Sequence, residues 1–203
     1  DAAGASTTDA YILTVTNTND AGSGLSLASD GDVADPDEDD TLSVTGTLSD
    51  DDGCTGSTCA LTYAWSNGDT SATTTLGQSD VGNTISVTLT YTDDRSSSNT
   101  ITLTAASDVD NVNDAGSGLS LASDGDVADP DEDDVLSVTG TLADEDGVTN
   151  AAPTYQWSRG SSAISGATSS SYTLVQADVG SIMSVVITYT DDLSSSNTIT
   201  LTA

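Results

Sequence analysis

The stretch NDAGSGLSLASDGDVADPDEDD occupies residues 19–40 and recurs without a single change at residues 113–134. A duplication of this length indicates a tandem array of like modules, because one core built from mixed elements has no need of it. Each copy ends in DPDEDD, in which five of the six residues are carboxylates, so the acidity of the chain is periodic. The duplication favours a structural or binding role over catalysis.

Outside the duplicated stretch, the chain alternates apolar and polar residues. In TLSVTGTL (residues 41–48) and ISVTLTYT (residues 85–92), the apolar side chains fall on one face and Ser or Thr on the other. A period of two with a polar outer face predicts half-buried antiparallel strands. Short strands between Gly, Asp and Ser turns, with no convincing helical segment, predict an all-β chain of two tandem β-sandwich domains placed end to end.

The expected domains are residues 17–110 and 111–203. The first copy is expected to form strands at residues 25–29, 41–48, 61–65, 73–76, 84–92 and 100–104, and the second copy repeats them. Residues 1–16 lie outside the repeat; the alternation of Tyr11, Leu13 and Val15 predicts the last strand of a preceding module, docked on a sheet edge. Trp65 and Trp157 are expected to fill the two cores, with a sugar-stacking platform as the alternative.

The charge of the chain restricts its partners. Thirty-three acidic residues against two cations and no histidine give a net charge of −31. A nucleic-acid partner is not expected, because phosphate contacts need Lys and Arg. No apolar run approaches the roughly 20 residues that span a bilayer, so this fragment is not expected to insert into a membrane, and Asp1 indicates an excised or processed piece.

So negative a chain repels itself unless something neutralises it. Bound Ca²⁺ would need carboxylates gathered in loops, whereas the surface of a halophilic protein would carry Asp and Glu on every exposed face. Exposed strand positions carry Ser and Thr instead (residues 43, 45, 47, 86, 88 and 90), and the Asp residues fall in turns. The pattern favours calcium, although both explanations can hold together.

Two cysteines lie in one short loop, CTGSTC, at Cys54 and Cys59. A pair so close in a Ser/Gly loop of an acidic protein predicts a local disulfide formed in an oxidising compartment. Two reduced thiols are the alternative; a zinc site fits less well, because two Cys without His make half a ligand set.

The second copy reads YQWSRGSSAISGATSSSYTLVQADVGSIMSVVITYTDD at residues 155–192, after LADEDG at 142–147. This stretch resembles the Ig-like repeats of bacterial cell-surface proteins. The first copy keeps LSDDDG, YAW, QSDVG and SVTLTYTDD with a shorter middle. The junction DVDNVNDA (residues 108–115) resembles the calcium-binding linker of cadherins, with Gly116 where that linker has Pro.

Arrays with both features are similar to the extender regions of giant RTX adhesins of marine bacteria, one of which binds ice. That resemblance implies Ig-like, cadherin-like sandwiches acting as calcium-stiffened spacers that project a terminal binding domain from the cell. Neither an EF-hand loop nor the RTX nonapeptide is present, so calcium would lie between loops that the fold brings together.

Ca²⁺ is the predicted cofactor, and its expected ligands lie at the poles of the sandwiches, most of them around the junction. From the first domain and the linker these are Asp35, Asp37, Asp39, Asp40, Asp80, Asp108, Asp110, Asn111, Asn113 and Asp114. The second domain adds Asp144, Glu145, Asp146, Asp191 and Asp192, and the matching positions of the first domain are Asn19, Asp20, Asp50, Asp52 and Asp93.

The expected function is that of a non-catalytic, calcium-stabilised spacer of a secreted, surface-anchored bacterial adhesin, a monomeric rod whose partners are the neighbouring repeats. The alternatives are a carbohydrate-binding or homophilic adhesion module attached to an extracellular enzyme, and a halophilic surface-layer Ig repeat. Paired carboxylates can hydrolyse glycosides, but the same acidic string repeated in both modules, without a cleft signature, argues against an enzyme.

Overall fold

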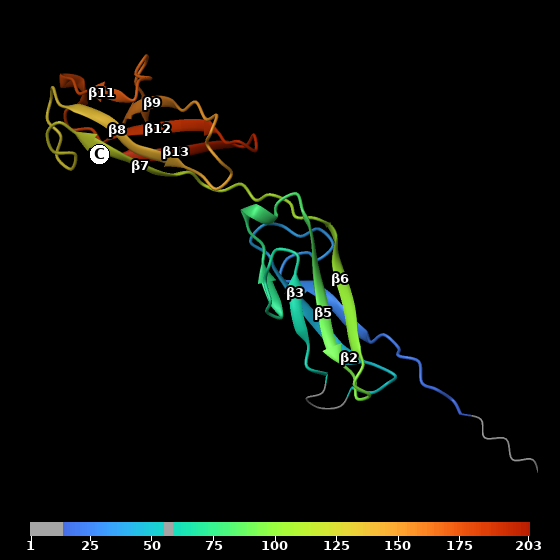
Figure 1. Cartoon of the computed structure of the whole chain (residues 1–203). Coiled ribbons are helices and arrows are strands. Elements are labelled where there is room, and N and C mark those ends of the chain that lie inside the picture. The colour runs from blue at the N-terminus through green and yellow to red at the C-terminus, as the bar shows by residue number, and fades with distance from the viewer. Residues whose placement is uncertain (1–13, 55–58) are drawn as a thin grey trace, which may run out of the picture. The chain divides into compact units, whose positions relative to one another are not determined.

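The computed structural model describes residues 14–54 and 59–203, and this part of the chain is all-β (Figure 1). It divides into two compact units, Asp1–Asp110 and Asn111–Ala203, called repeat 1 and repeat 2 below. Each repeat is described by itself. The prediction of Ig-like β-sandwiches is confirmed.

Repeat 1 pairs its strands in two antiparallel sheets. One has the order β1-β2-β4 and the other β3-β5-β6, so the chain crosses between the layers from β2 to β3, from β3 to β4 and from β4 to β5. A 3-10 turn, η2 (Gln78–Asp80), precedes β5. The strands are β1 (Ser23–Ser29), β2 (Thr41–Ser49), β3 (Thr62–Trp65), β4 (Thr73–Thr75), β5 (Thr84–Thr92) and β6 (Ser98–Asp108).

Repeat 2 has the same arrangement with one added strand. Its sheets have the orders β11-β8-β7 and β10-β9-β12-β13, and the longer middle of this copy supplies β10. A 3-10 turn, η3 (Gln176–Asp178), precedes β12. The strands are β7 (Ser117–Ser123), β8 (Val135–Ala143), β9 (Thr154–Arg159), β10 (Ser162–Ala163), β11 (Ser171–Thr173), β12 (Met183–Thr190) and β13 (Ser196–Thr202).

The tryptophans fill the cores, as expected. Trp65 and Trp157 are 4% and 0% exposed, and each indole N–H donates to a backbone carbonyl, that of Ser71 or Ser169, at 2.9 Å. A buried indole needs such an acceptor, because an unpaired N–H inside a protein costs the free energy of its lost water contact. Aliphatic residues of both sheets surround each ring.

Three details differ from the sequence predictions. The alternation of β2 stops at Gly46, which is exposed and has a φ of 99°, because a bulge there shifts the register against β1. β6 runs to Asp108, beyond the expected residues 100–104. Val15 lies outside any strand and is 83% exposed, while Tyr11 and Leu13 lie outside the described residues.

The turns gather at two ends of each repeat. At the end called the proximal pole, the segment before the first strand meets two turns, which in repeat 1 are bonded from the Asp94 N–H to the Gly53 carbonyl at 3.1 Å. At the distal pole, the β1–β2 loop meets the segment between β4 and η2, as in the bond from the Leu76 N–H to the Asp40 carbonyl at 2.9 Å. No helix in the described part of the chain is long and apolar enough to cross a membrane.

Candidate metal centre

Three carboxylates converge at the proximal pole of repeat 1. Asp50, Asp52 and Asp93 each offer an oxygen, and these oxygens lie within 4.8 Å of one another. Asp52 and Asp93 are only 6% and 2% exposed. Burying like charges so closely is unfavourable unless a cation or hydrogen-bond donors compensate them. The group has the composition of a site for a hard metal ion.

The β2–β3 turn and the segment before β1 place Asp52. Its backbone N–H donates to Asp50 Oδ1 at 2.8 Å, which folds the turn back on itself. Its carboxylate accepts hydrogen bonds from Asn17 Nδ2 at 2.6 Å and from the Asp20 N–H at 3.3 Å. One buried carboxylate therefore ties the incoming chain to a turn of the sandwich.

The β5–β6 turn places Asp93. Its Oδ1 accepts the N–H groups of Arg95 and Ser97, each at 2.9 Å, and its Oδ2 accepts Asn99 Nδ2 at 3.0 Å. The Ser97 amide, helped by Asn99 and Arg95, outweighs burial and holds the pKa of Asp93 below its ordinary value. Asp93 is therefore an anion at neutral pH.

A buried tyrosine orients the third carboxylate. The Tyr91 hydroxyl donates to Asp50 Oδ2 at 2.6 Å and accepts the Gly22 N–H at 2.7 Å. Burial, with the neighbouring Asp50 carboxylate, raises the pKa of Tyr91 to about 12. The phenol keeps its proton at neutral pH and remains a donor to Asp50.

Repeat 2 builds the same frame of hydrogen bonds, while its three corresponding carboxylates do not all lie within 4.8 Å of one another. The Asp146 N–H donates to Asp144 Oδ1 at 3.0 Å, and Asp146 Oδ2 accepts the Asp114 N–H at 3.1 Å. Asp191 Oδ2 accepts Asn197 Nδ2 at 2.8 Å. Asp146 and Asp191 are 4% and 5% exposed, and Asp146 Oδ1 is buried without a hydrogen-bond partner. That oxygen could accept a ligand from outside the chain.

A glycine in each repeat, Gly22 or Gly116, allows the segment before the first strand to pack against a buried tyrosine. A Cβ atom on Gly116 would collide with the hydroxyl of Tyr189, and the backbone of Gly116 hydrogen-bonds to that hydroxyl. Proline would bring the same clash and has no N–H to donate. This contact therefore favours glycine at position 116.

The predicted ligands divide by pole. The structure brings proximal residues of each repeat together: Asn19, Asp20, Asp50, Asp52 and Asp93 in repeat 1, and Asn113, Asp114, Asp144, Asp146 and Asp191 in repeat 2. Asp192 serves the β8–β9 turn instead: it accepts the amides of Thr149 and Asn150, which hold its pKa below its ordinary value. Glu145 is exposed in the same turn, and Asn111 is half-buried.

At the distal pole of repeat 1, carboxylates organise loops. Asp40 Oδ2 accepts the Asp37 N–H at 3.1 Å, and Asp80 Oδ2 accepts the Gly77 N–H at 3.1 Å. Asp35 accepts the Ser107 hydroxyl, Asp108 accepts the Thr84 hydroxyl, Asp39 has a φ of 69°, and Asp110 is bonded through its backbone. No three of these predicted carboxylates meet within 4.8 Å inside the repeat.

The sequence did not reveal the residues that hydrogen-bond to the carboxylates of the proximal site. It did not single out Asn17, Tyr91 and its counterpart Tyr189, or Asn99 and its counterpart Asn197. The signal was the string SSSNTITLT, which is identical at residues 96–104 and 194–202 and which carries both asparagines. An Asn in a strand of Ser and Thr residues has no sequence pattern that distinguishes a buried position from an exposed one.

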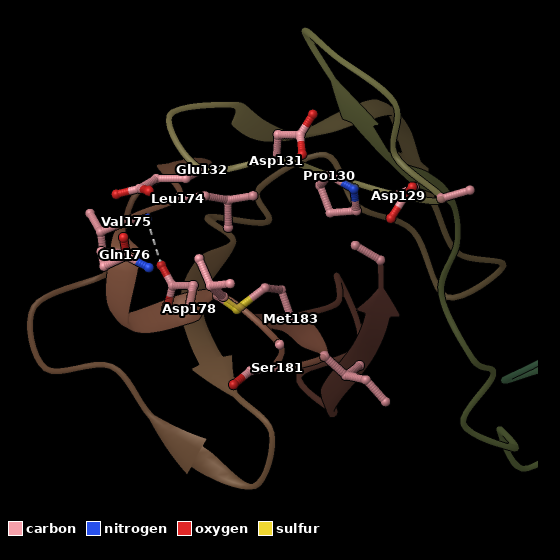
Figure 2. A pocket seen from close by; sticks show the side chains of 15 residues that line it. Asp129, Pro130, Asp131, Glu132, Leu174, Val175, Gln176, Asp178, Ser181 and Met183 are labelled. Atoms are coloured by element: carbon pink, nitrogen blue, oxygen red, sulfur yellow. Dashed lines mark hydrogen bonds between the residues drawn. The ribbon is translucent and has the colours of Figure 1, made fainter.

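A pocket lies elsewhere, at the distal pole of repeat 2 (Figure 2). It holds about 570 Å³ between the β7–β8 loop and η3. Its buried acid, Asp178, is already bound by the Val175 N–H at 2.8 Å and by Arg159. In repeat 1, Val109 fills this place, bonded to Asn83 and Gly82. The pocket therefore offers no candidate chemistry of its own.

Comparisons with known proteins add little. No protein-family model matches the chain, and no curated protein matches it. Among solved structures, the chain is similar to the three N-terminal domains of the bacteriophage RB49 Highly Immunogenic Outer Capsid protein (Hoc), with 18% sequence identity and a TM-score of 0.28. The match covers 88% of this chain and 59% of that chain. A likeness this low carries no argument about function.

Proposed function

We propose that the chain is a pair of non-catalytic, calcium-stabilised spacer repeats of a large, secreted, surface-anchored adhesin. The observation that supports this most is Asp146, a nearly inaccessible carboxylate whose Oδ1 has no partner. Its other oxygen holds the Asp114 amide, in the segment that leads into repeat 2. A cation on Asp146 would thus act on both the sandwich and the linker.

The chemistry of the donors favours calcium. The proximal sites offer carboxylate and amide oxygens from Asp and Asn, the hard ligands that Ca²⁺ collects in flexible geometry. Zinc and soft metals prefer His and Cys; the chain has no histidine, and its two cysteines form a disulfide, Cys54–Cys59. The disulfide also supports an oxidising, extracellular location.

The position of the acids favours a bound ion over general halophilic solvation. Among the carboxylates that the structure describes, only Asp108 lies within a strand, and the others lie in turns and loops. A salt-adapted surface would spread carboxylates over the exposed strand faces as well. The clustering of carboxylates in the turns at the poles therefore supports a bound ion.

The anchoring of the linker favours a spacer. In repeat 1, the Asp110 N–H donates to the Pro36 carbonyl at 2.9 Å, and its carbonyl accepts the Glu38 N–H at 2.8 Å. In repeat 2, Asn113 Nδ2 donates to Asn197 Oδ1 at 2.9 Å. Two residues, Asn111 and Val112, separate these anchors. Calcium that fixes the second anchor would leave the linker few free dihedral angles.

Carbohydrate binding has less support. Sugar-binding faces present exposed aromatic rings, but no aromatic side chain within residues 14–54 and 59–203 is exposed. Tyr63, Tyr155 and Tyr172 are half-buried, and the other four are buried.

Thermal unfolding at constant ionic strength tests the proposal. Calcium that binds only the folded repeats stabilises them by about 3 to 4 kcal/mol at a few hundred times its dissociation constant. We expect the melting temperature to rise with CaCl₂ and not with an equivalent amount of NaCl. Asp146→Asn should remove much of the rise, while Asp129→Asn, the same charge change at the distal pole, should keep it. An equal response to both salts would favour the halophilic explanation instead.

A further inference from the structure

We infer that the two repeats neutralise the same buried carboxylate site with different cations. Repeat 1 uses its own guanidinium, that of Arg95, whereas repeat 2 takes a divalent metal ion from solution. The inference rests on the proposed function for the class of ligand, and adds which repeat binds it and why.

The sequences of the two repeats differ at one position beside the proximal carboxylates, in the turn between the last two strands. Residues 92–104 read TDDRSSSNTITLT and residues 190–202 read TDDLSSSNTITLT, so the turn and the last strand of the two repeats differ only at Arg95 and Leu193. The turn has the same shape in both repeats: Ser96 and Ser194 have φ values of 69° and 76°. The substitution therefore changes the charge at the proximal pole without changing its frame.

In repeat 1, a cation is already in place. Arg95 Nε lies 3.3 Å from Asp52 Oδ1, whose side chain is 2% exposed. The backbone of the same residue donates to Asp93, and the guanidinium charge helps to lower the pKa of Asp93. Asn17 Nδ2 also donates to Asp52 Oδ1, at 2.6 Å. Both deeply buried carboxylates of repeat 1 thus have compensation from within the chain.

In repeat 2, no internal cation is available. Leu193 is uncharged and 47% exposed, and Asp146 Oδ1, the atom on the counterpart of Asp52, is buried without a hydrogen-bond partner. The only other cationic side chain of the protein, Arg159, is bound to Asp178 at 2.5 Å. A buried carboxylate without compensation is strongly unfavourable. A metal ion from solution supplies what Arg95 supplies in repeat 1.

Three single substitutions in the full chain test this assignment, with calcium binding followed by titration calorimetry at fixed NaCl. Leu193→Arg should abolish one calcium per chain or weaken it by about tenfold or more, because a positive charge beside the carboxylates opposes a second cation. Arg95→Leu should add one calcium or tighten one site by a similar factor. Ile182→Arg is the matched control: it adds the same charge at an exposed distal position of repeat 2, 67% exposed in the wild type, and should bind as the wild type does.

The outcomes separate this inference from the proposed function. Calcium binding by the wild type that neither Leu193→Arg nor Arg95→Leu changes would overturn the different roles of the repeats and leave the spacer proposal standing. The same loss in Ile182→Arg as in Leu193→Arg would also overturn them, because the effect would then come from the added net charge and not from its position. No calcium binding by the wild type would overturn the proposed function and the inference together.

Discussion

At the scale of single residues, Gly22 in repeat 1 and Gly116 in repeat 2 show how closely the segment before the first strand packs on each sandwich. A Cβ atom at Gly22 would collide with the Tyr91 hydroxyl and lie 2.8 Å from Leu48. We expect Gly22→Ala to destabilise repeat 1 by about 2 kcal/mol, the cost of overpacking a close contact. Gly77→Ala is the control, since nothing lies within 4 Å of its Cβ position. Urea denaturation measures both, and equal effects would contradict the docking contact.

The phenol that meets Gly22 predicts an alkaline transition. Burial raises the pKa of Tyr91 to about 12, above the value of about 10 in an unfolded chain. A pKa raised by folding gives stability that is complete below pH 10 and lost as the pH rises through about 12. The difference in tyrosinate absorbance between wild type and Tyr91→Phe should therefore have its midpoint near 12. A midpoint near 10 would show that the phenol is not held as described.

At the scale of elements, the disulfide is a local brace. Cys54 and Cys59 have Cα atoms 5.4 Å apart, and the corresponding loop of repeat 2 has no cysteine. Closing so short a loop stabilises by about 2 kcal/mol at most. We expect the double variant Cys54→Ser, Cys59→Ser to keep its fold and calcium binding with at most that loss in unfolding free energy. Unfolding of repeat 1 on reduction would contradict this role.

The strands could be predicted because their side chains alternate. Residues 84–92 form the expected strand, and Trp65 and Trp157 fill the expected cores. The bulge at Gly46 could not, since it depends on pairing with β1. The proximal carboxylates were predicted from their turns, but Asn99 and Tyr91 were not, because their polar roles arise only where the turns meet.

At the scale of the whole molecule, the proposed function turns on one equilibrium. Without a cation, the linker is a short acidic peptide and the proximal carboxylates repel one another, so we expect the repeats to be hinged. Calcium that binds the ordered proximal site of repeat 2 would shift this equilibrium toward a single arrangement, in proportion to its preference for the ordered form.

Small-angle X-ray scattering in calcium and after complete chelation, at one NaCl concentration, tests this most directly. The account predicts a longer maximum dimension and a narrower cross-section in calcium for the wild type, whereas Leu193→Arg should give a scattering profile that does not change with calcium. NaCl alone should not reproduce the change, because screening weakens repulsion without fixing the linker. A scattering profile that is the same with and without calcium would contradict the calcium-stiffened spacer.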